Sequence, residues 1–512
     1  MDIQETLIKE LIKKKVRTSD DLAKTKRRIA KELKSNCPGN ISLLKTYHEL
    51  RRKGKIKKQP ILEILLRTRP VRSLSGIVNI SVLTKPYPCP GKCIYCPQEK
   101  GIPKSYLSGE PAVERAKRLK FNPYLQVKKR IGMLEMEGHP TDKIELRIVG
   151  GTWSYYPKSY QAQFIKKCFD ACNGKNSDSI ESAQKANEKA KNRIIGLSIE
   201  TRPDFIDEKE IERLRCLGVT MVELGIQSIY DDVLKLNKRG HNVEATIRAT
   251  KLLKDAGFKV LYQMMPNLLG SNLKRDEEMF RELFKNPDFQ PDLLKIYPCA
   301  LLKEASLYKL WKKKKYHPYD KKQLLILIRD IKRKIPPYVR IQRITRDIPS
   351  KRIAGGEKEI SNLRQNLQED QMKNNWKCNC IRCREVGKDY DPKEKLHLFR
   401  KDYKASGGKE IFLSFEDKEK LYSLLRLRIT SDNKAIIREL HTYGQLHPIT
   451  RTKNQKAAQH KGLGKKLMEE AEKITKKEFY LKEVYVISGI GAKDYYRKLG
   501  YKLKDTYMVK YL

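Results

Sequence analysis

Apolar and polar positions change their spacing twice along the chain, and this divides the sequence into three parts. In the middle part, apolar runs rich in β-branched residues predict six strands, at 76–84, 143–149, 193–199, 219–226, 258–265 and 292–298. Apolar residues at helical spacing lie between these runs, for example at 208–217 and 242–256. Strands that alternate with helices form βαβ units around a parallel sheet, so we expect an α/β fold in which six repeats make a partial (βα)6 barrel.

The two ends of the chain have different patterns. Residues 1–75 place apolar side chains at helical spacing with Lys and Arg on the other faces, which predicts a basic helical region. The last part, from about 399 to 512, begins with strands and continues with a long amphipathic helix and a further strand, at 409–416, 421–429, 435–443, 459–477 and 483–488. We therefore predict domains at 1–75, 76–355 and 399–512, joined by a linker at 356–398.

Composition adds a class of partner. The 512 residues are too many for one core, and 110 Lys and Arg against 62 Asp and Glu give a formal net charge of +48. Residues 1–75 contribute 21 Lys and Arg against 8 Asp and Glu. Adaptation to heat enriches Lys and Glu together and leaves the net charge near zero, so the surplus favours a polyanion, with RNA as the first expectation. A solvated basic helical face is the alternative for 1–75.

No apolar run reaches membrane-spanning length, and the first residues do not resemble a signal peptide. We expect a cytoplasmic protein without a membrane partner. Its eleven cysteines are then reduced thiols or metal ligands.

A Pro- and Gly-rich loop after the first predicted strand holds Cys89, Cys93 and Cys96 at spacing C-x3-C-x2-C. Three thiolates can hold three irons of a [4Fe–4S] cluster and leave the fourth iron open to a ligand. Zinc is the rival, but no nearby His or Cys completes four ligands. The loop resembles that of the radical S-adenosylmethionine (SAM) enzymes, which implies a cluster at these cysteines, bound SAM and a partial α/β barrel.

Barrel chemistry lies at the C-terminal ends of the strands, and polar or glycine residues follow several predicted strands. The resemblance implies that the Gly150-Gly151 segment binds the amino group of SAM. The common position of Glu200 and Gln227 at strand ends predicts that they also contact SAM. Taken alone, the glycines are only a turn signal, and the two polar residues suit an ordinary rim.

The linker holds a second cysteine group, Cys378, Cys380 and Cys383, at spacing C-x-C-x2-C. Three thiolates within six residues are typical of a structural zinc site. Cys299, after the sixth strand, is the expected fourth ligand, with His317 and His397 as alternates. The four cysteines that remain are expected to be buried packing: Cys37, Cys168, Cys172 and Cys216.

The amphipathic helix of the last part begins with residues 459–464, which fit Q-x-x-G-x-G. Glycines let successive backbone N–H groups face a phosphate, and a helix N-terminus adds positive potential. With the strands on either side, this order resembles the GNAT acetyltransferases, so the expected ligand is acetyl-CoA.

The combination of the two domains with the cysteine linker resembles the catalytic subunits of Elongator, the tRNA wobble-uridine acetyltransferases, in their archaeal single-chain form. Matching segments are 195–204, 223–228, 239–241, 380–387, 487–489 and 494–501. The resemblance implies acetyl-CoA contacts from the strand before the loop, the loop itself and a following tyrosine: Glu439, Leu440, His441, Thr442, Gly462, Leu463, Gly464 and Tyr495. It also implies a role near acetyl-CoA for Lys143 and, for Tyr495 or Tyr496, the orientation of the thioester or a water.

The hypothesis for the reaction joins the two halves. One electron cleaves SAM to a 5′-deoxyadenosyl radical, which removes a hydrogen from the methyl group of acetyl-CoA. The resulting carbon radical adds to C5 of uridine 34, and oxidation and hydrolysis leave a carboxymethyl group. The implied partners are the tRNA anticodon stem-loop, a one-electron donor and, as one possible assembly, a homodimer. We expect the acetyl group to share the barrel mouth with SAM. The alternatives are a protein lysine acetyltransferase with a structural cluster, and an inactive RNA-binding scaffold.

Overall fold

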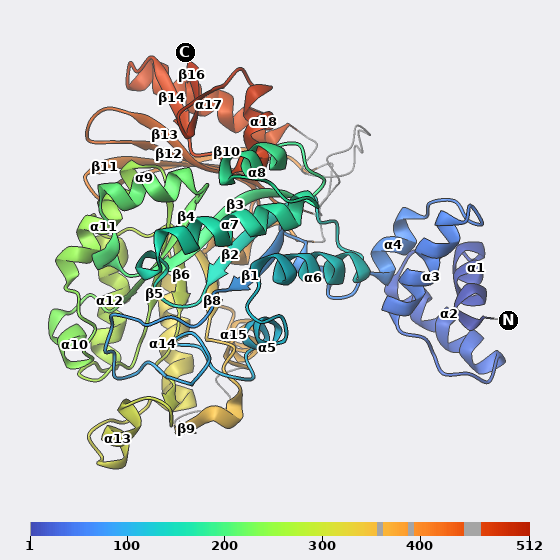
Figure 1. Ribbon diagram of the computed structural model, residues 1–512, viewed down its shortest axis with the longest axis horizontal. Helices are drawn as coiled ribbons and strands as arrows, with labels where there is room; N and C mark the ends of the chain where they lie inside the picture. Colours follow the sequence, from blue (N-terminus) through green and yellow to red (C-terminus); the bar gives the residue numbers. More distant parts are fainter. Residues whose placement is uncertain (1, 356–361, 388–393, 445–461) are drawn as a thin grey trace.

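Seven parallel strands form the central sheet of the computed structural model, which describes residues 2–355, 362–387, 394–444 and 462–512 (Figure 1). In order across the sheet they are β1 (Val78–Leu83), β2 (Lys143–Val149), β3 (Arg193–Thr201), β4 (Met221–Gln227), β5 (Lys259–Met264), β6 (Leu293–Ile296) and β8 (Arg340–Ile344). β1 and β8 are the two edges of this sheet, so the barrel is open. The predicted α/β class and the six predicted strands, β1–β6, are confirmed, and β8 is a seventh strand that was not foreseen.

Helices cover the outer face of this sheet, and the sequence of β2 shows why. Ile144, Leu146 and Ile148 are buried in the main core, whereas Lys143, Glu145 and Arg147 alternate with them and face the inside of the barrel, half-buried. The helices of this region are α5 (Pro111–Arg118), α6 (Pro123–Met136), α7 (Lys158–Asn173), α8 (Ile180–Asn187), α9 (Glu208–Cys216), α10 (Asp231–Leu236), α11 (Val243–Asp255), α12 (Leu273–Lys285), α13 (Leu307–Lys312) and α14 (Lys321–Lys334).

Four basic helices stand to one side of the barrel in Figure 1: α1 (Ile3–Lys13), α2 (Ser19–Glu32), α3 (Asn40–Arg52) and α4 (Pro60–Leu66). They have a core of their own, built from residues such as Leu7, Leu43 and Tyr47. This unit meets the barrel at the end of α6, where Arg67 Nε donates to the carbonyl oxygen of Gly138 at 2.8 Å. The helices expected in this part of the chain are present.

His139 lies buried at this junction, with Nδ1 2.9 Å from Ser73 Oγ and Nε2 3.0 Å from the carbonyl oxygen of Thr68. Burial lowers its pKa to about 4, against an ordinary value of 6.5. Between these two values the unfolded chain binds a proton that the folded chain does not, so stability falls as the pH falls from 6.5 towards 4. We expect the melting temperature to drop more over this range in the wild type than in His139→Gln, as followed by circular dichroism. Equal drops in both proteins contradict this role.

A second sheet of seven strands forms the C-terminal part. In order across the sheet its strands are β10 (His397–Ala405), β11 (Gly408–Glu416), β12 (Leu421–Ile429), β13 (Ala435–Thr442), β14 (Glu483–Val486), β16 (Tyr507–Tyr511) and β15 (Lys502–Lys504). β13 and β14 pair in parallel. The helix α17 (Leu463–Glu478) packs against β12 and β13 of this sheet, and α18 (Lys493–Arg497) follows β14 along the chain. The predicted strands are present, and β10, β15 and β16 are additions.

This C-terminal sheet packs against the N-terminal ends of the barrel strands. Lys259, the first residue of β5, pairs with Glu439 of β13 at 3.1 Å, and His441 Nε2 lies 2.8 Å from the carbonyl oxygen of Ser75, before β1. The barrel mouth, where SAM is expected, lies at the opposite ends of the same strands. That the acetyl group reaches this mouth stays a prediction.

The connection between the two sheets runs through a small two-stranded sheet, β7 (Leu301–Leu302) and β9 (Ile353–Gly355), and then α15 (Leu363–Lys373) and α16 (Ile381–Arg384). Within the described ranges, no helix combines the length and the apolar character needed to cross a bilayer.

Candidate functional site

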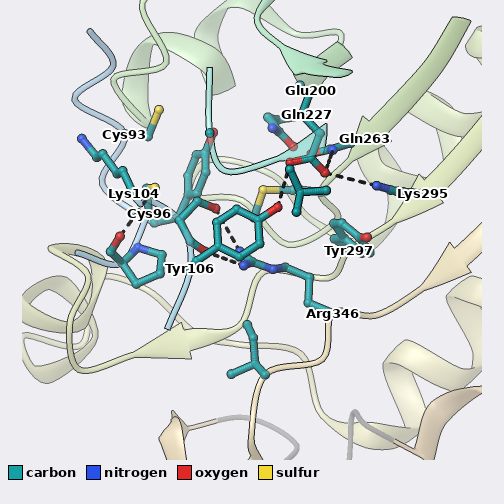
Figure 2. A pocket seen from close by; sticks show the side chains of 18 of the residues that line it. Cys93, Cys96, Lys104, Tyr106, Glu200, Gln227, Gln263, Lys295, Tyr297 and Arg346 are labelled. Atoms are coloured by element: carbon teal, nitrogen blue, oxygen red, sulfur yellow. Dashed lines mark hydrogen bonds and ion pairs between the residues drawn. The ribbon is translucent and has the colours of Figure 1, made fainter. Parts of the chain in front are cut away.

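The cysteine loop lies between β1 and α5 and forms one wall of a cavity of about 290 Å³ at the C-terminal ends of the barrel strands (Figure 2). Cys89, Cys93 and Cys96 all line this cavity. The opposite walls come from strand ends and the residues after them, among them Gly151, Glu200 and Gln227. The strand-end residues predicted from the sequence and the three cysteines are thus brought to one cavity.

The spacing of the three sulfurs fits a cluster better than a single ion. A Cβ placed on Gly91 would lie 3.5 Å from Cys93 Sγ and 3.6 Å from Cys89 Sγ, so this glycine leaves room between two of the thiols. A single zinc holds its thiolates about 3.8 Å apart, since each Zn–S bond is about 2.3 Å. Among the described residues, Cys89, Cys93 and Cys96 are not a group whose sulfurs all lie within 4.8 Å of one another. A cubane, which spreads its ligands further, suits the loop.

Two buried arginines lie against this loop, and the sequence analysis gave them no role. Arg239 Nη1 donates to Cys93 Sγ at 3.6 Å. Burial opposes ionisation of Cys93, but the Arg239 guanidinium outweighs it and lowers the pKa of the thiol. Arg202 is 4% exposed, and its Nη1, which has no hydrogen-bond partner among the described atoms, lies 2.6 Å from where a Cβ of Gly91 would stand. Both positive charges favour thiolates and an anionic cluster.

The floor of the cavity is a polar network centred on Glu200, as the dashed lines in Figure 2 show. Glu200 accepts from Tyr106 Oη at 2.8 Å, from Gln263 Nε2 at 3.3 Å and from Lys295 Nζ at 3.3 Å. Lys295 also pairs with buried Glu223. Burial opposes the charge of Lys295, but Glu223 outweighs it and raises the pKa of the ammonium group, which stays charged. Such a set of fixed charges can orient a polar ligand in the cavity.

The other residues predicted at the barrel mouth are Gly150, Gly151 and Gln227, and they differ in what they do there. Gly151 lines the cavity, whereas a Cβ on Gly150 would lie 1.9 Å from Thr84 Oγ1, so Gly150 serves the tight turn. Gln227 has φ +76°, which costs a residue other than glycine roughly 1–3 kcal/mol and often marks a functional position. Sequence reasoning missed Tyr106, Gln263, Tyr297 and Arg346, which lie outside the motifs that carried the resemblance and line the cavity.

The second cysteine group is a compact site, but Cys299 is not part of it. The sulfurs of Cys378, Cys380 and Cys383 all lie within 4.8 Å of one another, and hydrogen bonds from the other two thiols lower the pKa of Cys380. The group lies near the start of β8, where the backbone N–H of Ile381 donates to Val339.

Cys299 follows β6 and packs with Ile94 and Tyr95 beside the cysteine loop, at the opposite end of the barrel. The prediction of Cys299 as the fourth ligand is therefore wrong. The alternate His317 lies at that end too, since its carbonyl oxygen accepts from Asn267, beyond β5. His397 begins β10.

Three segments of the C-terminal part converge on Gly464. A Cβ on Gly464 would lie 3.1 Å from Tyr495 Oη, 3.6 Å from Thr442 Oγ1 and 3.7 Å from Leu440 Cδ2. Gly462, with φ +71°, directly precedes α17, whose first residue is Leu463. Residues 459–461 of the predicted loop lie outside the described ranges. Strand, glycine turn and tyrosine thus meet at a helix start, where the first backbone N–H groups of a helix can bind an anion.

Three of the predicted acetyl-CoA or catalytic residues turn elsewhere. Glu439 pairs with Lys259 and with Arg426 at 2.8 Å, and these cations outweigh burial and lower its pKa to about 2. His441 faces Ser75, as described above. Tyr496 lies in the core of the C-terminal sheet, whereas Tyr495 is 40% exposed. The side chains of Glu439, His441 and Tyr496 therefore hold the structure together rather than face the glycine turn.

Gly464→Val is expected to weaken acetyl-CoA binding by roughly tenfold or more, because the added methyl groups fill the space between Tyr495 and Thr442. Isothermal titration calorimetry measures the loss. Gly132→Val in α6, where a Cβ meets nothing within 4 Å, is the matched control and should bind as the wild type does. Undiminished affinity in Gly464→Val would place the ligand elsewhere.

Comparison with family models gives three matches along the chain. Residues 87–283 match the radical SAM superfamily, residues 291–374 the radical SAM C-terminal domain, and residues 440–510 the acetyltransferase (GNAT) domain. These ranges include the cysteine loop, the cavity and the turn at Gly464.

Curated proteins and a solved structure are similar over most of the chain. A tRNA uridine(34) acetyltransferase of Methanocaldococcus jannaschii is 48% identical over 478 residues, which cover 89% of this chain and 88% of that one. Elongator complex protein 3 of Homo sapiens is 40% identical, with 87% of this chain and 86% of that one covered. The structure of archaeal Methanocaldococcus infernus Elp3 with an N-terminal deletion superposes with a TM-score of 0.75 at 44% identity, covering 86% of this chain and 100% of that chain.

Proposed function

The chain belongs to the family of the tRNA uridine(34) acetyltransferases and Elongator complex protein 3, and on this premise we propose that it builds a carboxymethyl group on C5 of wobble uridine. It is an acyltransferase of the radical SAM superfamily. The observation that carries the proposal is that one chain holds both a three-thiol loop on a polar cavity and a glycine turn suited to CoA. C5 of uridine is no amine-like nucleophile, so an acetyltransferase site alone cannot modify it.

The residues of the cavity suit the cluster and SAM that the family implies. Cys89, Cys93 and Cys96 would hold the irons, and the orphan Nη1 of Arg202 supplies a charge for the anionic cluster. Gly151 offers close backbone approach to the amino group of SAM. When bound, the cluster and SAM supply a carbon radical able to remove a hydrogen from the methyl group of acetyl-CoA. Glu200 and Lys295 orient the polar groups of the bound SAM.

We place the route of the acetyl group along the inside of the barrel. The glycine turn and the cavity lie at opposite ends of β2, a strand of seven residues that spans about 20 Å. Its inner face carries Lys143, Glu145 and Arg147, and Arg147 already lines the cavity. Burial lowers the pKa of Lys143, which stands at the end nearest the C-terminal sheet. In this proposal Lys143 contacts acetyl-CoA where it enters the barrel, and Tyr495 contacts it at the turn.

The remaining parts of the chain position the substrates. We assign the anticodon stem-loop of tRNA to the basic helices within residues 1–75, because of their charge. Residues 76–355, 356–398 and 399–512 are the radical SAM, linker and acetyltransferase units. Zinc at Cys378, Cys380 and Cys383 fixes the linker near the start of β8, and elemental analysis is expected to find one zinc per chain. A cytoplasmic location and a homodimer stay predictions from the sequence.

The test is incubation of cluster-loaded protein with tRNA, SAM, acetyl-CoA and dithionite under argon. We expect both 5′-deoxyadenosine and carboxymethyluridine, identified by mass spectrometry of the digested RNA. Omitting SAM or acetyl-CoA should remove the modified uridine. Absence of both products from the complete mixture contradicts the proposal. Acetylation of a basic peptide without SAM or reductant would instead support a protein lysine acetyltransferase.

A further inference from the structure

A second, open cavity of about 980 Å³ lies on the other side of the cysteine loop. Pro90, Gly91 and Lys92 of the loop form one of its walls, and α10, the turn after it and the start of α11 form another. Gly91 and Arg202 line both this outer cavity and the cavity of the strand ends. The two cavities are therefore neighbours across one segment of the loop, and substrate and SAM use only one of them in the proposed function.

Gly91 and Arg202 separate the two cavities, and Gly91 lies directly against the cluster sulfurs. A Cβ on Gly91 would lie 3.5 and 3.6 Å from two of the three sulfurs, so the glycine backbone itself lies against both. Because Gly91 has no side chain, a molecule seated in the outer cavity can approach the thiols more closely than at any bulkier residue. Electron transfer weakens steeply with distance, so this thin wall is a good point of entry for an electron.

The charges around the outer cavity select the class of partner. Lys92, Lys235 and Lys238 line it, and all three are exposed. The carboxylates on the same rim are engaged within the chain: Asp204 pairs with Arg202 at 2.7 Å, and Asp231 accepts from the backbone N–H of Val243 at 2.8 Å. The three lysines therefore give the surface around the outer cavity a positive electrostatic potential, which attracts the acidic surface of a partner.

An apolar side chain lines the same cavity as these lysines. It belongs to Phe205, which is half-buried. An apolar centre inside a charged rim is typical of a protein–protein contact. Lysines with scattered apolar side chains also suit RNA, which is a separate outcome of the test below.

We propose that the outer cavity is the docking site of a small acidic electron-transfer protein that carries a flavin or an iron–sulfur group. This inference rests on the proposed function, because it presupposes the cluster. The reduced group of the donor loses one electron and is oxidised, and the electron crosses at Gly91 to the cluster, which is reduced by one. No proton or other group moves in this step. Buried Arg202 and Arg239 lie beside the sulfurs and stabilise the added negative charge.

The experiment compares two reductants on the cluster-loaded full chain. Stopped-flow absorbance follows reduction of the cluster by dithionite and by a reduced bacterial flavodoxin, an acidic one-electron donor. Lys92→Glu/Lys235→Glu/Lys238→Glu is expected to slow reduction by flavodoxin about tenfold or more at low salt, with dithionite reduction unchanged. Rising salt should slow the wild type towards the variant. The control reverses three exposed lysines of α17, Lys473→Glu/Lys476→Glu/Lys477→Glu, and should behave as the wild type.

Several results would overturn the inference. Equal rates with flavodoxin in the wild type and the variant exclude docking at this surface. Loss of tRNA affinity in the variant, measured by fluorescence anisotropy, with flavodoxin reduction unaffected would assign the surface to RNA. If the triple variant does not load its cluster, Lys235→Glu/Lys238→Glu, on and after α10 and outside the cysteine loop, gives the same comparison. A wild type without a cluster refutes the proposed function itself, whereas normal SAM cleavage with dithionite and charge-insensitive flavodoxin reduction refutes only the docking site.

Discussion

Cys93→Ala is expected to abolish formation of carboxymethyluridine and 5′-deoxyadenosine while leaving acetyl-CoA binding intact. The side chain supplies one of only three thiolates in the loop, and two thiolates do not hold a [4Fe–4S] cluster stably. The variant also leaves Arg239 without its sulfur partner in a buried position, which adds to the loss. Acetyl-CoA should still bind, because the turn at Gly464 lies at the other end of the barrel.

Three measurements check this prediction. Iron analysis after anaerobic reconstitution should find about four irons in the wild type and far fewer in the variant. Mass spectrometry of digested tRNA and calorimetry with acetyl-CoA report the two activities separately. Cys216→Ala removes an exposed thiol outside the loop and should behave as the wild type. A Cys93→Ala protein that retains the modified uridine would refute the assignment of the loop.

The main strands and helices could be predicted from the sequence because their apolar patterns are clear. The six foreseen strands are apolar on both faces or alternate cleanly, as Ile144, Leu146 and Ile148 do in β2. β8 was not predicted because three of its five residues are polar: Arg340, Gln342 and Arg343. The last two line the cavity. A strand that faces a polar cavity loses the apolar signal that marks strands in the sequence.

Positions in space were harder to foresee than elements. Cys299 and the linker cysteines were expected to share one zinc ion, yet β8 and α15 lie between them along the chain, and the linker returns to the other end of the barrel. Spacing along a sequence does not say at which end of a sheet a connection lies. The cluster thiols were foreseen because they form one short loop, whereas Arg202 and Arg239 reach it from other segments and needed the structure.

The alternation of side chains along a strand also explains why some of the residues predicted to contact acetyl-CoA point away from the glycine turn. Four consecutive residues of β13 were expected at the ligand, but neighbours in a strand point to opposite faces. Leu440 and Thr442 face Gly464, whereas Glu439 and His441 face the barrel. A motif carried over as a continuous segment therefore mixes ligand contacts with contacts between the two sheets.

Those contacts between the sheets include a buried ion network, and Arg438→Met is expected to be the most destabilising substitution in it. Arg438 of β13 donates to both oxygens of Asp292, at 2.6 and 2.9 Å, and to Glu410 at 2.9 Å. All three side chains are at most 1% exposed. Burial opposes the charge of Asp292, but Arg438 outweighs it and holds the pKa of the carboxyl far below its usual range.

Met fills much of the space of Arg438 but leaves Asp292 short of positive charge. Arg428 still bonds Glu410 at 3.0 Å, whereas Asp292 keeps only Arg426 at 3.6 Å and Lys254 at 3.7 Å, which do not replace its two lost bonds. Breaking a buried pair in this way costs about 3–5 kcal/mol, so we expect a loss of that size in the free energy of unfolding, measured with guanidinium chloride. Arg400→Met, in an exposed pair with Glu478, should lose no more than about 1 kcal/mol.

A second variant separates the charge from the packing. If an unpaired carboxylate causes the loss, adding Asp292→Asn to Arg438→Met should recover part of the stability, because a neutral amide costs less to bury without its arginine, and Lys254 keeps Glu410 as its anion. If the shape of the arginine is what matters, the double variant should be at least as unstable as Arg438→Met. Because Asp292 directly precedes the segment of β6 that carries Lys295, the same variants test whether the C-terminal sheet also sets the floor of the cavity. Restored stability should then return the 5′-deoxyadenosine yield as well.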